Sequence, residues 1–106
     1  MNFTEMVDRA VEIRAKYNQL EKKKYGRAWT TAELGQGLVG DVGDLSKLIL
    51  AKEGIRDIQE VDPKLAHELS DCLWAILVLA HEYGIDLGQS FVKTMNELEQ
   101  KISKDS

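Results

Sequence analysis

Apolar residues recur at intervals of three or four along most of this 106-residue chain, and this spacing limits the possible folds more than any other feature. No stretch alternates apolar and polar residues in the way that is typical of a strand. The only proline, Pro63, follows Asp62, a pair typical of the start of a helix. The sequence therefore predicts an all-α protein.

Capping signals place the first two helices. The first is expected over residues 3–24, where Asn2 and Glu5 form a capping box. The second is expected from the capping box at residues 30–33 to Lys52, close to a glycine that would end it.

The third helix is expected to start at Asp62-Pro63 and to reach Tyr83, before Gly84. The fourth should run from Asp86 to about Ile102, with its apolar stripe inward and residues 103–106 fraying. Four helices with short connections predict a four-helix bundle-like fold, in a single domain over residues 1–106.

Two acidic pairs dominate the chemistry of the chain. Asp41 and Asp44 are spaced i,i+3 on the second helix, as are Glu68 and Asp71 on the third. Helical wheels place Asp41 inside the apolar stripe of its helix and the other three near a stripe border, where purely solvated acids are unusual. Because grouped carboxylates repel one another and lose hydration, this pattern predicts a cation site. All-oxygen ligands suit Mg²⁺ or Mn²⁺.

The acids have other interpretations besides a cation site. Each acid taken alone could simply pair with a lysine or cap a helix. A di-iron bundle needs a Glu-x-x-His pair, but Lys64 and Val78 stand three residues before His67 and His81. His67 could hydrogen-bond Asp71 one turn away, or it could be a surface histidine.

Glycines cluster in the second helix, although each weakens a helix by about 1 kcal/mol relative to alanine. Gly37 lies one turn from Asp41 and is expected to leave room for a ligand. Gly40 and Gly43 are expected to let another helix approach closely. Residues 35–40 match the glycine pattern of dinucleotide-binding sites, but no strand precedes them. The match is therefore not interpreted as a dinucleotide-binding site.

Composition limits the partners. The net charge of −4 disfavours binding to a nucleic-acid polymer. The single cysteine, Cys72, suits a reducing compartment, and no secretory signal is visible, so a cytoplasmic location is expected. The longest apolar run, residues 72–80, is too short to span a membrane. Residues 69–80 are apolar almost all round the helix, which predicts a homodimer or homotetramer.

Two acidic motifs resemble those of the MazG-like all-α nucleoside triphosphate pyrophosphohydrolase superfamily, which includes dimeric dUTPases and dCTPases. Residues 38–45 (LVGDVGDL) look like its first motif, with the glycine between the acids. Residues 68–74 (ELSDCLW) match its second motif, and residues 83–87 (YGIDL) are similar to the usual continuation. The resemblance extends from about Trp29 to Ile102.

The resemblance implies hydrolysis between the α and β phosphates of a (deoxy)nucleoside triphosphate, which yields a monophosphate and pyrophosphate. It also implies a role in removing non-canonical or surplus nucleoside triphosphates from the nucleotide pool. It assigns catalytic metal binding to Asp41, Asp44, Glu68 and Asp71, with Mg²⁺ as the cofactor.

Four further residues are candidates for substrate binding. Lys47 could reach a phosphate or simply be solvated, and Trp29 could stack on a base or pack in the core. Lys93 and Asn96 look like a lysine and an asparagine that some members carry on the last helix, although a solvated face explains them equally well.

The first motif departs from the family pattern, because both of its glutamates are aspartates here. Aspartate keeps the charge but is shorter by one methylene, and Mg²⁺ requires strict geometry. An alternative is therefore a catalytically weak MazG-like relative that binds nucleotides or proteins as a regulatory module. A purely structural bundle is a third possibility.

Overall fold

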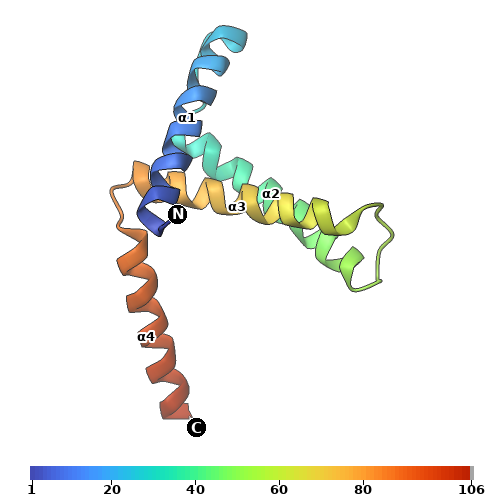
Figure 1. The fold of residues 1–106 in the computed structure, drawn as a ribbon, viewed down its shortest axis with the longest axis vertical. Coiled ribbons are helices and arrows are strands. Elements are labelled where there is room, and N and C mark those ends of the chain that lie inside the picture. The colour runs from blue at the N-terminus through green and yellow to red at the C-terminus, as the bar shows by residue number, and fades with distance from the viewer. Residues whose placement is uncertain (106) are drawn as a thin grey trace.

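The computed structural model describes residues 1–105, which form four helices (Figure 1). These are α1 (Phe3–Tyr25), α2 (Thr31–Lys52), α3 (Val61–Glu82) and α4 (Leu87–Asp105). No strand occurs within this part of the chain, so the all-α prediction is confirmed. None of the helices in residues 1–105 is both long and apolar enough to cross a bilayer.

The two predicted capping boxes are present. The side chain of Asn2 accepts a hydrogen bond from the Glu5 amide at 2.9 Å, and Thr30 accepts one from the Glu33 amide at 3.1 Å. Each glutamate in turn accepts a hydrogen bond from the amide of its capping residue. Gly26 then ends α1 in the left-handed conformation, with φ of +81°. Local sequence therefore fixes the start of α1 and of α2.

The predicted start of α3 is wrong. The helix begins at Val61, and the residue before it, Glu60, has a left-handed φ of +52° and makes no side-chain cap. Asp62 lies inside the helix, so it is not the N-cap, and its carboxylate accepts a 2.7 Å hydrogen bond from Lys52 Nζ. This ion pair joins the end of α2 to the start of α3.

Helices α2 and α3 lie side by side as an antiparallel hairpin, and α1 crosses the C-terminal half of α3 (Figure 1). The indole nitrogen of Trp74 donates a hydrogen bond of 3.0 Å to the Ala10 carbonyl oxygen. Val78 is completely buried, and it forms a core cluster with Ala10, Leu34 and Leu77. The face of α3 that carries Trp74 and Val78 is therefore covered by α1.

Helix α4 extends away from the other three helices, so they do not close into a four-helix bundle within one chain (Figure 1). The stripe that was expected to point inward is exposed, and it consists of Phe91, Met95, Leu98 and Ile102. The predicted fraying after residue 102 is also wrong, because α4 continues through Asp105; residue 106 lies outside the described residues.

Candidate functional site

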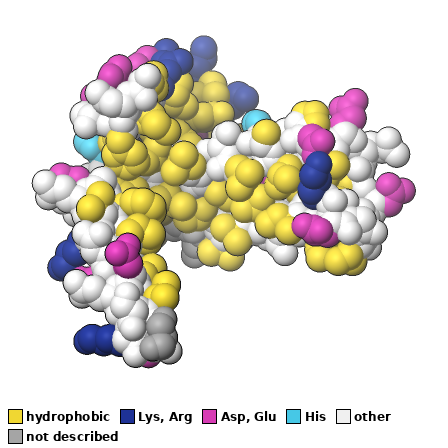
Figure 2. Space-filling view, turned by 60° about the horizontal axis from the view of Figure 1, so that its bottom comes forward, with side chains coloured by type: hydrophobic (Ala, Val, Ile, Leu, Met, Phe, Trp, Pro, Cys, Tyr) yellow, Lys and Arg dark blue, Asp and Glu magenta, His cyan; other side chains and the backbone are white. Residues whose placement is uncertain are grey.

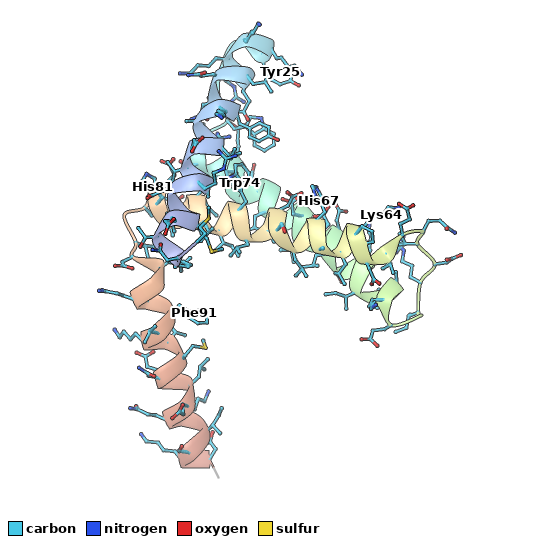
Figure 3. The ribbon with its side chains drawn as sticks, viewed as in Figure 1. Tyr25, Lys64, His67, Trp74, His81 and Phe91 are labelled. Carbon is cyan, nitrogen blue, oxygen red and sulfur yellow. The ribbon has the colours of Figure 1, made fainter. Side chains whose placement is uncertain are left out.

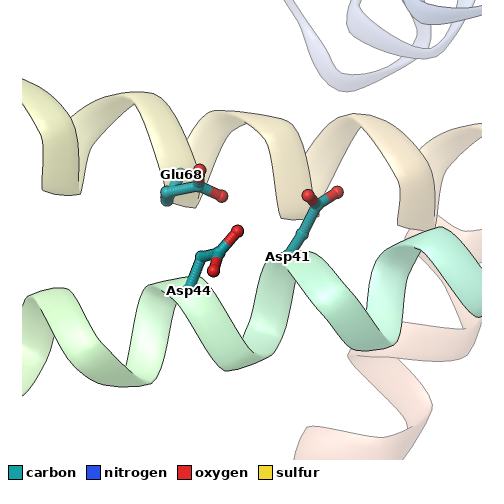
Figure 4. Close-up of side chains that lie close together, drawn as sticks. All are labelled: Asp41, Asp44 and Glu68. Carbon is teal, nitrogen blue, oxygen red and sulfur yellow. The ribbon is translucent and has the colours of Figure 1, made fainter.

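Three of the four predicted acids come together between α2 and α3 (Figure 4). One carboxylate oxygen from each of Asp41, Asp44 and Glu68 lies within 4.8 Å of the other two. Asp41 and Glu68 are half-buried, whereas Asp44 is exposed. The i,i+3 spacing puts Asp41 and Asp44 on one face of α2, and the antiparallel packing of α3 brings Glu68 opposite them.

The fourth predicted acid, Asp71, lies beside this group but not within it. It is half-buried on α3, and one of its carboxylate oxygens, Oδ2, lies 3.1 Å from His67 Nε2. His67 is therefore a neighbour of Asp71, and it is also exposed, so both interpretations of this histidine hold. Asp71 also lines the same cavity as Asp41.

Burial and the neighbouring acids raise the proton affinity of Asp41 and Glu68. Burial raises the pKa of Asp41 above its ordinary value, and the charges of Asp71 and Asp44 raise it further. Burial likewise raises the pKa of Glu68, with added contributions from Asp41, Asp71 and Asp44. A bound cation would offset this repulsion directly.

One atom of the cluster is left without a protein partner. Oxygen Oε2 of Glu68 is buried and accepts no hydrogen bond from the described residues. A buried carboxylate oxygen of this kind normally has a donor or a cation. With three carboxylates as hard oxygen donors, the residues fit Mg²⁺ or Mn²⁺.

A cavity of about 410 Å³ opens next to the acids, between α1, α2 and α3. Three aromatic side chains, Tyr17, Trp29 and Trp74, contribute to its wall, and so do Asp41 and Asp71. Its volume falls within the range of small-molecule sites, which are mainly apolar with a few polar groups. Trp29, predicted from its position before α2, is thus placed in a pocket that adjoins the acids.

A buried ion pair that the sequence interpretation missed holds Trp29 in place. The guanidinium of Arg14 lies 3.2 Å from the Glu21 carboxylate and donates a 2.8 Å hydrogen bond to the Trp29 carbonyl oxygen. The Trp29 amide donates a 2.8 Å hydrogen bond to Glu21. Both backbone groups of Trp29 are therefore fixed. The available signal was the position of Arg14, four residues after Ala10 and inside the apolar stripe of the first helix.

The glycines act differently from the expectation. A β-carbon at Gly37 would lie 3.3 Å from the Trp29 ring, so the missing side chain makes room for this tryptophan, which in turn borders the cavity. At Gly40 and Gly43 a β-carbon would meet nothing within 4 Å, so within this chain no helix approaches them closely.

A second cavity, of about 290 Å³, lies on another side of Glu68. Its wall includes Lys64 and His67, which α3 carries along the hairpin (Figure 3). The sequence interpretation assigned no role to Lys64. The sequence could have indicated this position, because Lys64 stands four residues before Glu68 and therefore one helical turn away on the same face.

The remaining predicted substrate residues are not brought to the acids. Lys47 is exposed on α2, one turn after Asp44. Lys93 and Asn96 line a shallow surface hollow on α4, which extends away from the hairpin (Figure 1). Their proposed contacts with a substrate stay predictions.

No protein-family model matches this chain, and no match was found among curated proteins or among solved structures. The chemistry of the site therefore has to be inferred from its own residues.

Proposed function

We propose that this protein is a Mg²⁺-dependent nucleotide pyrophosphohydrolase that cleaves (deoxy)nucleoside triphosphates between the α and β phosphates and acts as a homo-oligomer. The observation that carries this proposal is that the cluster of Asp41, Asp44 and Glu68 adjoins an aromatic cavity, whose wall includes Asp41. A nucleoside triphosphate has matching parts, because its base can stack on aromatic rings and its phosphates require cations. The resemblance of the two acidic motifs to the MazG-like superfamily supports the same chemistry.

The carboxylates of Asp41, Asp44 and Glu68 would hold the metal, with Asp71 beside them in the wall of the cavity. When bound, Mg²⁺ supplies charge neutralisation of the phosphates and lowers the pKa of coordinated water. Asp71 lies outside the three-oxygen group, so its carboxylate is available to accept a proton from the attacking water. His67, at 3.1 Å, orients that carboxylate.

We infer the direction of the bound substrate from the two cavities. The base and sugar would occupy the aromatic cavity, where Trp29 is fixed by Arg14 and Glu21. The terminal phosphates would extend past Glu68 toward Lys64 and His67, which line the second cavity. The bond between the α and β phosphates would then lie beside the acids.

The test is product analysis. Purified protein is incubated with a panel of ribo- and deoxyribonucleoside triphosphates and Mg²⁺, and the products are separated. The expected products are a monophosphate and pyrophosphate. Release of diphosphate and orthophosphate would contradict the proposed bond cleavage. Glu68→Gln should abolish turnover with helical content retained, whereas the matched change Glu53→Gln, at an exposed position after α2, should leave turnover unchanged.

A regulatory nucleotide-binding module is the second candidate. It is favoured by the two shortened acids and by the exposure of Asp44, because a weakly held metal would reduce catalysis more than binding. Nucleotide binding measured by calorimetry, with no turnover across the whole panel, would favour this candidate over the enzyme.

A further inference from the structure

The aromatic cavity is distinguished by the combination of three rings with charged side chains in one wall. Apolar character alone does not distinguish it, because hydrophobic side chains also spread from α4 across the junction of the helices and along the hairpin (Figure 2). The ring centroids of Tyr17 and Trp74 lie 5.8 Å apart, and the two planes are tilted by 54°. Since these rings both line the cavity and are not stacked on one another, they offer aromatic surface to a ligand.

Two of the rings are held in place without a ligand. The indole nitrogen of Trp74 donates a hydrogen bond to the Ala10 carbonyl oxygen, and both backbone groups of Trp29 are hydrogen-bonded. Even so, Trp29 and Tyr17 are 46% and 48% exposed. Aromatic surface that is fixed and uncovered can bind a flat ring at little cost in conformational entropy.

The charged side chains of the wall have an excess of negative charge. They are one cation, Arg14, and three acids, Glu21, Asp41 and Asp71. Arg14 and Glu21 bind each other and the backbone of Trp29, so their charges offset one another and their polar atoms already have partners. The charges left to face a ligand are therefore those of Asp41 and Asp71.

Asp71 keeps its charge beside the cavity even when a cation binds the other acids. It lies outside the three-oxygen group of Asp41, Asp44 and Glu68. Its partner His67 is largely in solvent, with 73% of its side chain exposed. A ligand in the cavity therefore meets aromatic faces and a carboxylate, both of which attract positive charge.

We propose that the aromatic cavity selects nucleotides whose base carries a positive charge, as does a guanine that is alkylated at N7. Such a base is flat, so it can stack on the rings of Trp29, Trp74 and Tyr17, and its charge is attracted by their faces and by Asp71. This inference rests on the proposed function, which places the base in this cavity. It narrows the substrates to alkylated nucleoside triphosphates.

Nucleoside binding to the metal-free protein tests this selectivity without hydrolysis. One probe is 7-methylguanosine, at a mildly acid pH where its base is a cation. The other is its isomer 1-methylguanosine, which has the same methyl group on a neutral base. NMR titration of the indole N–H signals of Trp29 and Trp74 should show that 7-methylguanosine binds about 10-fold more tightly. Equal affinities, tighter binding of the neutral isomer, or no binding of either would overturn the proposal.

Asp71→Asn tests the source of the selectivity, because it removes the charge and keeps the shape of the side chain. The affinity for 7-methylguanosine should fall by about 3-fold, and that for 1-methylguanosine should stay unchanged. Asp105→Asn, at the far end of α4, is the matched control and should change neither affinity. An equal loss of affinity for both nucleosides in Asp71→Asn would contradict selection by charge.

Tetramethylammonium separates a charged base from other organic cations. It carries the charge without a flat ring, so it should bind about 10-fold more weakly than 7-methylguanosine. Binding of equal strength would assign the cavity to quaternary ammonium compounds and would overturn the assignment to a base.

Turnover separates this inference from the proposed function. With Mg²⁺, kcat/KM for 7-methylguanosine triphosphate should exceed that for GTP by about 10-fold. Hydrolysis of both triphosphates without any preference for the charged base would overturn the inference and leave the proposed function standing. Selective binding of 7-methylguanosine without turnover of any triphosphate would instead contradict the proposed hydrolysis and support the selectivity of the cavity.

Discussion

The ring of Trp29 occupies the space beside Gly37, so closely that a β-carbon on Gly37 would lie 3.3 Å from ring atom Cζ3. Arg14 and Glu21 hold the carbonyl oxygen and the amide of Trp29, so a β-carbon on Gly37 would have to be accommodated by a shift of the ring and not of the backbone. The shape of the aromatic cavity therefore depends on the absence of one methyl group.

Gly37→Ala is expected to displace Trp29 and to disturb the cavity. The indole emission spectrum should change, and the KM for a nucleotide substrate should rise more than kcat falls. Gly40→Ala is the matched control, because a β-carbon there meets nothing within 4 Å. That change should stabilise the protein by about 1 kcal/mol through helix propensity alone. Equal effects of the two changes would contradict the role given to Gly37.

Arg14→Met is expected to lower the free energy of unfolding by about 3–5 kcal/mol, because it leaves the Glu21 carboxylate with no cation in a site where both side chains are nearly buried. Arg14→Met combined with Glu21→Gln should be less destabilising than the sum of the two single changes, since the uncompensated charge is gone. Urea denaturation of the three variants and the parent gives the coupling energy. Simple additivity would show that the pair does not act as a unit.

The stability of the metal-free protein should fall as pH rises above the ordinary carboxyl range. The folded-state pKa values of Asp41 and Glu68 are raised, so their favourable contribution is complete below the unfolded-state pKa and is lost as the groups ionise. Asp41→Asn should therefore raise Tm at neutral pH in the presence of a chelator. Thermal unfolding across a pH series measures both effects.

Mg²⁺ should reverse this loss. Added Mg²⁺ should raise the Tm of the parent protein at neutral pH in a concentration-dependent way, and it should stabilise Asp41→Asn much less. An equal rise in both proteins would remove Asp41 from the metal site.

The start of α2 gives an opposite pH dependence. Hydrogen bonds from Arg27 and from the Thr30 amide lower the pKa of Glu33 from its ordinary value to about 2. Its contribution to stability is present above the unfolded-state pKa and is lost as pH falls toward 2. Glu33→Gln should flatten the acid limb of the stability curve, and Thr30→Ala should lower stability by about 1 kcal/mol at neutral pH. An unchanged acid limb in Glu33→Gln would contradict this assignment.

Local signals predicted the helices well, because capping boxes and apolar spacing are properties of neighbouring residues. The boxes at Asn2 and Thr30 are present, and α2 ends at Lys52 as expected. The start of α3 was not predicted from Asp62-Pro63, because the helix already begins at Val61, and Asp62 pairs with Lys52, ten residues earlier, a contact that spacing does not reveal.

Spacing alone predicted that four acids would converge, and three of them, Asp41, Asp44 and Glu68, do so, whereas Asp71 lies beside them. It did not predict the ion pair of Arg14 and Glu21, because that contact depends on how the segment after α1 folds back. The exposure of Phe91 was likewise not predictable from the sequence. A stripe indicates that a helix needs a neighbour but not which molecule supplies it.

The hydrogen bond from Trp74 to the Ala10 carbonyl joins residues that are 64 positions apart. The hairpin of α2 and α3 closes a short loop and can form early, whereas docking of α1 on α3 must close a much longer one. Folding should therefore have an order, with the hairpin first and α1 last. Trp74 lies at that final contact. Its fluorescence in a Trp29→Phe background would therefore report the rate at which α1 docks, separately from the rate at which the helices form.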